Sequence, residues 1–150
     1  PLRLCWYHHL AFLVHYHFAN VFMRGVSEAL FWIRLQLTDD EEAASFEGIE
    51  CGEVIYWLKA NNRCEEANQV LERTLFRGIL LDMCQFLFES IECAAKGKVG
   101  VAFALLRKPL RDQLFLLEWV LTDRDGFLCE FGKGPAHVDL VELLKKSVNG

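Results

Sequence analysis

Two arginines and a glutamate follow one line of a strongly apolar segment, where paired guanidinium groups could bind a charged ligand. On a helix that turns about 100° per residue, Arg111 lies about 40° from Arg107, and Glu118 lies about 20° from it. Planar guanidinium groups suit phosphate or carboxylate recognition, because each can hold two oxygens at once. The alternative is a solvated edge, or ion pairs with acids of a neighbouring helix such as Glu72 or Asp82. The spacing predicts an anionic-ligand site at Arg107, Arg111 and Glu118, with the solvated edge as the simpler interpretation.

Histidines cluster near the start of the chain, where they could perform acid–base chemistry or hold a metal. Cys5, His8 and His9 have i, i+3, i+4 spacing, which a helix brings to one face. His15 lies two turns after His8 on the apolar side of the predicted helix, whereas His9 and His17 fall on its opposite, polar stripe. A zinc site needs about four ligands, and no other cysteine or histidine is paired with these by spacing. Because aromatic residues surround the histidines, we interpret them as packing residues and predict no metal and no cofactor.

Motifs of the common catalytic sites are absent from the sequence. It contains no G-x-S-x-G, no P-loop, no G-x-G-x-x-G and no H-E-x-x-H. The run 132–134 is too short for a phosphate-binding loop, and the acids at 39–42 are best explained as the start of a helix. The sequence therefore favours a non-enzymatic role.

Apolar residues recur at helical spacing along most of the chain, and breaks separate five helices. Thr38 with Glu41 has the spacing of a capping box, and the pair Asn62 and Glu65 repeats it. The predicted helices cover about residues 4–36, 38–59 (with a break at Gly48 and Gly52), 62–96, 99–122 and 135–147, with a short turn at 127–131. We predict an all-α, single-domain bundle of about five largely antiparallel helices over residues 1–150.

Two of these helices carry an irregularity. In the third, the polar side chains move to nearly the opposite side after Gly78, so either the helix kinks there or its halves pack on different neighbours. In the fourth, which is the most apolar, Pro109 predicts a kink or a junction because its ring clashes with the preceding turn.

Composition and charge limit the classes of function. Apolar residues make up 53% of the chain, which excludes disorder. The formal net charge is −5, so the sequence does not favour a nucleic-acid-binding domain. Residues 4–23 carry no formal charge, and about 20 apolar residues can span a bilayer. That stretch holds four histidines and Asn20, which are costly in lipid, so a buried core helix is predicted and no membrane segment.

The six cysteines are dispersed and show no C-x-x-C pair. Cys84 and Cys93 lie within one apolar helix, as small apolar residues do. Reduced thiols in a cytoplasmic protein are therefore predicted. The chain starts at Pro1 and not at Met, so whether it is a fragment of a longer protein stays open.

The run from Ala102 to Trp119 resembles uncharacterised bacterial helical proteins. Those proteins carry, after a long helix, a pattern of the type A-x-x-L-L-R-x-x-L-x-x-x-L-x-x-L-E-W, in which Arg107 and Glu118 occupy the matching places. More loosely, the long antiparallel helices resemble the HEPN superfamily, whose active members are metal-independent ribonucleases of defence and toxin–antitoxin systems. The hallmark of that superfamily is Arg followed four to six residues later by His, a spacing found here at Arg3 with His8 or His9.

Three functional hypotheses arise from these patterns. The leading one is a non-enzymatic interaction or regulatory domain that binds a protein partner or itself as a homodimer, because apolar residues nearly encircle the first and fourth helices. The HEPN resemblance implies instead a ribonuclease that acts on RNA through Arg3, His8 and His9. The third is capture of an anionic ligand by Arg107 and Arg111.

Overall fold

The computed structural model describes residues 2–37 and 40–132, with side chains from Trp6 onward, and it confirms the all-α bundle. No strand forms within these ranges. The elements are α1 (Leu2–Ser27), α2 (Asp40–Phe46), α3 (Val54–Ala60), α4 (Cys64–Ala95), α5 (Val99–Arg107), the π-helical segment η1 (Lys108–Gln113), α6 (Leu114–Thr122) and α7 (Arg124–Phe131). The helix predicted at 135–147 lies outside the described residues.

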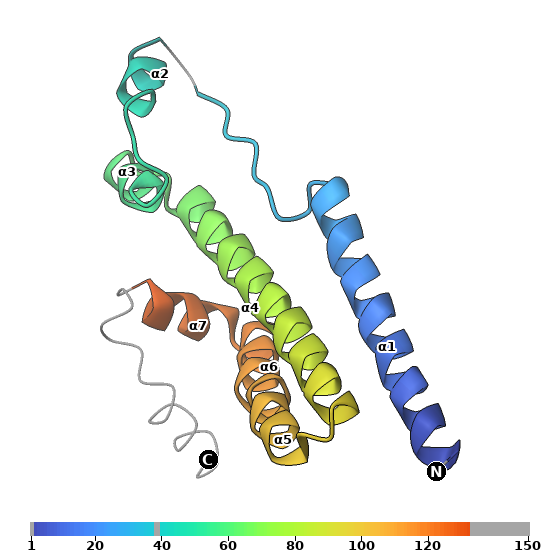
Figure 1. The fold of residues 1–150 in the computed structure, drawn as a ribbon. Helices are drawn as coiled ribbons and strands as arrows, with labels where there is room; N and C mark the ends of the chain where they lie inside the picture. The colour runs from blue at the N-terminus through green and yellow to red at the C-terminus, as the bar shows by residue number, and fades with distance from the viewer. Residues whose placement is uncertain (1, 38–39, 133–150) are drawn as a thin grey trace.

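The long helix α4 is central, and its neighbours run antiparallel to it on two sides (Figure 1). α1 lies along one side, while α5, η1 and α6 form one continuous column along the other. α2 and α3 lie near the beginning of α4, and α7 packs on α4 and α6. The buried core lies where α4, α6 and α7 meet and consists of Ile79, Met83, Leu116, Phe127 and Leu128.

The helix α1 ends at Ser27, so the predicted end at Gln36 is wrong. Ala29 has a φ of 57°, in the left-handed region, and the Leu30 amide donates to the Gly25 carbonyl at 2.9 Å. This pattern closes a helix end by satisfying its last carbonyl groups. The apolar spacing beyond Ser27 belongs to a loop that packs on the bundle, which periodicity alone does not distinguish from a helix.

The chain after α1 folds back onto the bundle through aromatic contacts. The Phe31 ring stacks on Phe22 at 5.5 Å between ring centres and lies 6.3 Å from Phe76 of α4. A Cβ atom on Gly25 would come within 2.7 Å of the Phe31 ring, so glycine is what lets the ring approach. These contacts fasten the end of α1 to the middle of α4.

Replacing Ala29 with glycine should raise the free energy of unfolding by up to about 1 kcal/mol. The left-handed conformation costs a non-glycine residue about 1–2 kcal/mol, and the greater freedom of glycine in the unfolded chain offsets part of that gain. Urea titration followed by circular dichroism measures the change. The matched control is Ala104→Gly, at an exposed position of α5, which should lower the free energy of unfolding by about 1 kcal/mol. Equal destabilisation by both substitutions would contradict the prediction.

The helix α4 passes through Gly78 without a break, although its polar side chains change sides there. In its first half, Glu72 accepts a hydrogen bond from Arg124 of α7 at 2.8 Å. In its second half, the Cys84 carbonyl lies 3.1 Å from Nε2 of His15 on α1. At these two points the halves of α4 contact different neighbours, as the second alternative predicted, while a kink at Gly78 stays a prediction.

Pro109 is fully buried in η1, which joins α5 to α6 without interrupting the helical column. Proline lacks the amide hydrogen and crowds the preceding turn of an α-helix. A π-helical turn closes i→i+5 hydrogen bonds and occurs mostly as a single wider turn inside an α-helix. Pro109 therefore marks a junction, as one alternative predicted, while the angle of a kink there stays a prediction.

The segment predicted as a short turn at 127–131 belongs to the helix α7. Asp123 is the N-cap, and its Oδ1 accepts a hydrogen bond from the Gly126 amide at 3.0 Å. Phe127 is completely buried, and its ring meets the Trp119 ring edge-on at 5.4 Å. The Asp123 cap is the sequence signal that the prediction missed, in a helix only about two turns long.

The other predicted helix boundaries have mixed outcomes. The break at Gly48 and Gly52, between α2 and α3, is confirmed. α3 ends at Ala60, directly before the predicted stop. Asn62 has a φ of 60° and α4 begins at Cys64 without a side-chain cap, so the second capping box is wrong. Thr38 of the first capping box lies outside the described residues.

Asp123→Ala should lower the free energy of unfolding by about 1 kcal/mol, because the first turn of α7 loses the acceptor for its amide hydrogen. Thermal unfolding measured by calorimetry tests this value. Asp123→Asn keeps an oxygen acceptor and is the matched control. Its free energy of unfolding should change by at most a few tenths of a kcal/mol. An equal loss in both variants would show that the cap contributes nothing.

Candidate interaction surface

The predicted anion-binding residues lie exposed on the column of α5, η1 and α6. Arg107 and Glu118 are exposed. The Arg111 side chain is 50% exposed, and its Nε lies 3.8 Å from Oδ1 of Asp112. The anionic-ligand site at Arg107, Arg111 and Glu118 stays a prediction. The structure contains an apolar trough between α1 and α5, and none of these three residues lines it.

The acids considered as partners for these arginines are paired with other cations. Glu72 accepts from Nε of Arg124 at 2.8 Å, and this hydrogen bond raises the pKa of Arg124. Asp82 lies 3.4 Å from Nζ of Lys108. The alternative that Arg107 and Arg111 form ion pairs with Glu72 or Asp82 is therefore wrong.

The four histidines of α1 divide between its two sides, as the predicted helical pattern has them. His8 and His15 are half-buried and face α4 and α5, while His9 and His17 are exposed. The backbone of Arg3 lies in α1, but its side chain is not among those described. Because His8 and His9 lie on different sides of the helix, a site that uses both has little geometric support.

Two classes of site find no support in the part of the chain that the structure describes. Within it, no three histidine, cysteine or acidic side chains lie close enough together to hold a metal ion. None of the helices in the same part is both long and apolar enough to cross a membrane.

An apolar trough of about 560 Å³ lies between α1 and α5, with α4 as its floor. Tyr7 and Val14 of α1 form one wall, Phe103 and Leu106 of α5 form the other, and Ser90 and Ala94 of α4 lie at the floor. Its volume falls within the range of about 300–1,000 Å³ that is typical of binding sites. The trough is therefore large enough to take several side chains of a partner.

Two histidines and a serine line the trough, and two of these three side chains are satisfied within the protein. His15 Nε2 lies 3.1 Å from the Cys84 carbonyl oxygen, and Ser90 donates to the Leu87 carbonyl at 2.8 Å. His8 differs, because its Nε2 is buried and has no hydrogen-bond partner. A buried polar atom without a partner costs free energy and is uncommon in folded proteins. The trough therefore offers an unused hydrogen-bonding atom.

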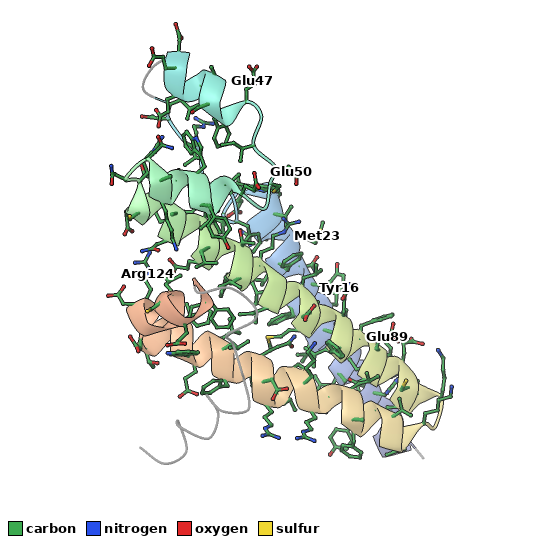
Figure 2. The ribbon with its side chains drawn as sticks, turned by 90° about the vertical axis from the view of Figure 1, so that its left-hand side faces the viewer. Tyr16, Met23, Glu47, Glu50, Glu89 and Arg124 are labelled. Atoms are coloured by element: carbon green, nitrogen blue, oxygen red, sulfur yellow. The ribbon has the colours of Figure 1, made fainter. Side chains whose placement is uncertain are left out.

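The trough continues the face of α4 that α7 covers. Glu72 and Ser90 are separated by about five helical turns, so they lie on the same line of α4. Arg124 of α7 binds Glu72, at the covered end of that line. Figure 2 shows Arg124 on one side of the molecule and Tyr16 and Glu89 on the other. This face of α4 is thus covered by α7 at one end and borders the trough at the other.

An outward stripe of apolar side chains runs along α1 and faces away from α4. Its members are Trp6, Leu10, Leu13, Val14 and Val21, which are 77%, 55%, 51%, 59% and 69% exposed. Among the described residues, nine apolar side chains are buried while twenty large apolar ones are exposed. Monomeric proteins rarely expose apolar surface on this scale, and such patches mark interaction sites.

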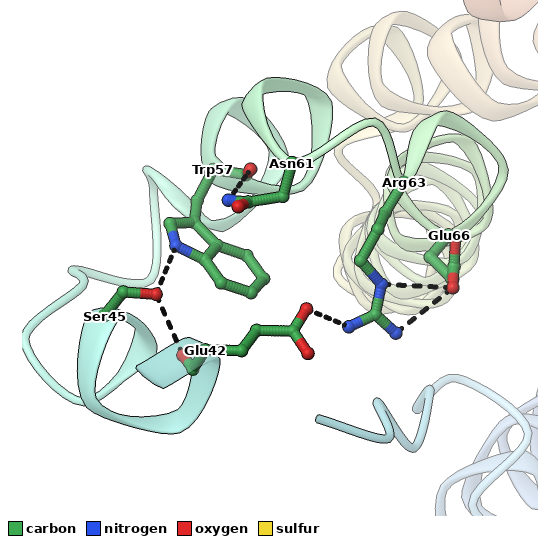
Figure 3. Close-up of polar contacts among 6 residues, drawn as sticks. All are labelled: Glu42, Ser45, Trp57, Asn61, Arg63 and Glu66. Carbon is green, nitrogen blue, oxygen red and sulfur yellow. Dashed lines mark hydrogen bonds and ion pairs between the residues drawn. The ribbon is translucent and has the colours of Figure 1, made fainter. Parts of the chain in front are cut away.

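A cluster of polar side chains connects α2 and α3 to the beginning of α4 (Figure 3). Arg63 donates to Glu42 at 2.8 Å and, through two nitrogens, to Glu66 at 3.1 and 3.2 Å. The hydrogen bond to Glu42 raises the pKa of Arg63. Trp57 donates to the Ser45 hydroxyl at 3.3 Å. Because these groups bind one another, we interpret the cluster as a structural clamp.

The five cysteines whose side chains are described are free thiols. Cys84 and Cys93 lie in α4, buried and half-buried, as predicted for small apolar residues. Burial raises the pKa of the Cys84 thiol. Cys51, Cys64 and Cys129 are exposed.

Cys84 should resist alkylation in the folded protein. A raised pKa leaves less of the reactive thiolate at a given pH, and burial also blocks the reagent. At mildly alkaline pH we expect iodoacetamide to modify Cys51, Cys64 and Cys129 at least about tenfold faster than Cys84. Peptide mass spectrometry over time measures the four rates. The control is the protein in urea, where the rates should converge, and equal rates in the folded protein would contradict the prediction.

Comparisons with known proteins gave no match, since no family model, no curated protein and no solved structure matches the chain. Function therefore has to be inferred from the surface itself. The trough was not predicted from the sequence, because its lining comes from three helices whose order in space no local pattern contains. The small residue Ala102, in an otherwise apolar helix, is a weak signal in the sequence that pointed to it.

Proposed function

We propose that this chain is a non-enzymatic helical interaction domain that forms a homodimer through the outward stripe of α1. The exposure of that stripe is the observation that carries the proposal. Trp6 and Val21, separated by about four turns, are 77% and 69% exposed. An apolar stripe of this length on the outside of a helix is the usual surface for packing against another helix.

The outward stripe supplies much of the apolar area that a stable dimer needs. Its five side chains are at least half exposed and, at on the order of 100 Å² each, offer roughly 500 Å². A standard interface buries about 800 Å² on each partner. Exposed neighbours on α1 that do not line the trough, Tyr16 and Met23, add to the area of the stripe.

Charge also favours a second copy as the partner. The chain has a formal net charge of −5, so two copies repel one another at most surfaces. Residues 6–23 of α1 carry no formal charge. Two α1 helices can therefore pack without bringing like charges together.

The double substitution Leu13→Glu with Val21→Glu should convert the dimer into a monomer, because it places two carboxylates within the stripe of each copy. Sedimentation velocity at micromolar concentration measures the change. Neither residue contacts the core, so the helical circular dichroism should stay unchanged.

The matched control is Tyr56→Glu with Leu121→Glu, which introduces the same charge at exposed apolar positions of α3 and α6. This control should remain dimeric. A wild-type chain that sediments as a monomer over the whole concentration range would refute the proposal. So would a dimer that both double variants leave intact.

The ribonuclease and anion-binding hypotheses have less support. The first rests on Arg3 with His8 or His9, and a site that joined all three would need two histidines that lie on different sides of α1. The second needs a cleft at Arg107 and Arg111, and both side chains are exposed on a helical surface.

A further inference from the structure

We infer that the apolar trough is the docking site for an amphipathic helix of a partner protein that carries acidic residues on one flank. The inference rests on the proposed function, since it names a second partner for the same interaction domain. It concerns a different surface from the outward stripe, although Leu10 and Val14 lie where the two surfaces meet.

The shape of the trough suits a helix. Its two walls, α1 and α5, both run antiparallel to the floor helix α4 (Figure 1). The floor residues Ser90 and Ala94 are small, so the backbone of an occupant could approach closely. One further helix in this position would complete a four-helix arrangement around a shared apolar core.

The opposite end of the same face already holds a helix. α7 lies on the line of α4 that includes Glu72, with Phe127 fully buried and Leu128 5% exposed beneath it. An ion pair between Arg124 and Glu72 borders that contact at 2.8 Å. This face of α4 thus binds α7 by burying apolar side chains and by pairing charges at the edge of the contact. The trough offers a similar apolar surface further along the same face.

Positive charge beside the trough favours a partner helix that carries acidic side chains. Phe103 lines the trough, and Arg107 lies four residues later, on the same face of α5. Arg111 follows after about one turn of η1. At 3.8 Å, the contact between Arg111 and Asp112 is too long for a hydrogen bond, so the guanidinium can bind another carboxylate. None of the described residues that line the trough is acidic, so its lining holds no carboxylate that would repel an acidic flank.

The buried nitrogen of His8 adds one requirement. Its Nε2 has no partner, and a hydroxyl or amide side chain in the otherwise apolar face of the docked helix would supply one. The α1 helix of a second copy does not meet these requirements, because its residues 6–23 contain no acid. The partner helix is therefore a different segment from the one that forms the proposed dimer.

The probe is a synthetic amphipathic peptide of about five turns, with leucines at i, i+3, i+4 and i+7 spacing, one central serine and glutamates along one flank. Its binding is measured by fluorescence anisotropy on the full chain that carries Leu13→Glu and Val21→Glu, which removes any competition from dimerisation. We expect saturable binding of one peptide per chain, weakened at least about tenfold by Ala94→Trp and by Arg107→Glu with Arg111→Glu. Replacing the flanking glutamates with lysines should weaken binding to a similar extent.

The matched controls are Val101→Trp, on an exposed part of α5 that does not line the trough, and Arg34→Glu, on an exposed loop. Both should bind the peptide as the parent does, and circular dichroism should show the same helical content in all variants. The inference is wrong if the peptide does not bind, if Ala94→Trp binds as tightly as Val101→Trp, or if both peptides bind equally. Such a failure leaves the dimer proposal intact, because the dimer is measured separately and through other residues.

Discussion

The packing of α4 between two antiparallel neighbours is the contact on which the rest of the structure depends. Among the described residues, α1 packs mainly along α4 and through the aromatic loop that comes after it, and the column of α5, η1 and α6 lies on the other side of α4. α7 is held where α4 and α6 meet, through Phe127, which is completely buried. Because α4 is shared by all of these contacts, loss of its packing would separate every long helix from its partner.

The same arrangement explains why so much apolar surface is left open. A layer of long helices has two faces and two edges, and one layer cannot bury all of them. α7 covers part of one face, while the trough and the outward stripe of α1 remain uncovered by the described residues. The two proposed partners therefore have one geometric origin, which is that three long helices in a layer expose apolar side chains that a further helix can cover.

Much of the fold could be predicted from local patterns, and the exceptions have physical causes. The helical wheel of α1 places His8 and His15 on the side that is half-buried, because a single long helix keeps its periodicity closely. The helical wheel fails to predict the structure after Ser27. There the aromatic residues pack from a loop, and the left-handed backbone conformation of Ala29 ends the helix. α7 was missed because a helix of about two turns shows almost no periodicity.

The candidate site was harder to predict than the fold. The excess of apolar residues on α1 could be recognised in the sequence, since it needs more partner surface than the chain supplies. The trough could not, because residues such as Tyr7 and Phe103 are far apart in the chain and meet only across α4. The ion pairs of Glu72 with Arg124 and of Asp82 with Lys108 could not be predicted either. The spacing of residues along one helix does not decide which basic side chain of a neighbouring helix lies close to a given acid.

The π-helical segment η1 gives the column about one residue more than an unbroken α-helix of the same length along its axis would hold. A π-helical turn holds about one residue more than an α-helical turn, so deleting one residue between 108 and 113 would restore an α-helix and leave α6 facing α4 as it does now. Inserting one residue there would instead rotate α6 by about 100°. Leu116, which is 8% exposed, and the α7 residues beyond it would then face away from α4. Substitutions in this segment can be absorbed by nearby side chains, whereas a single insertion would turn the second half of the column away from its core.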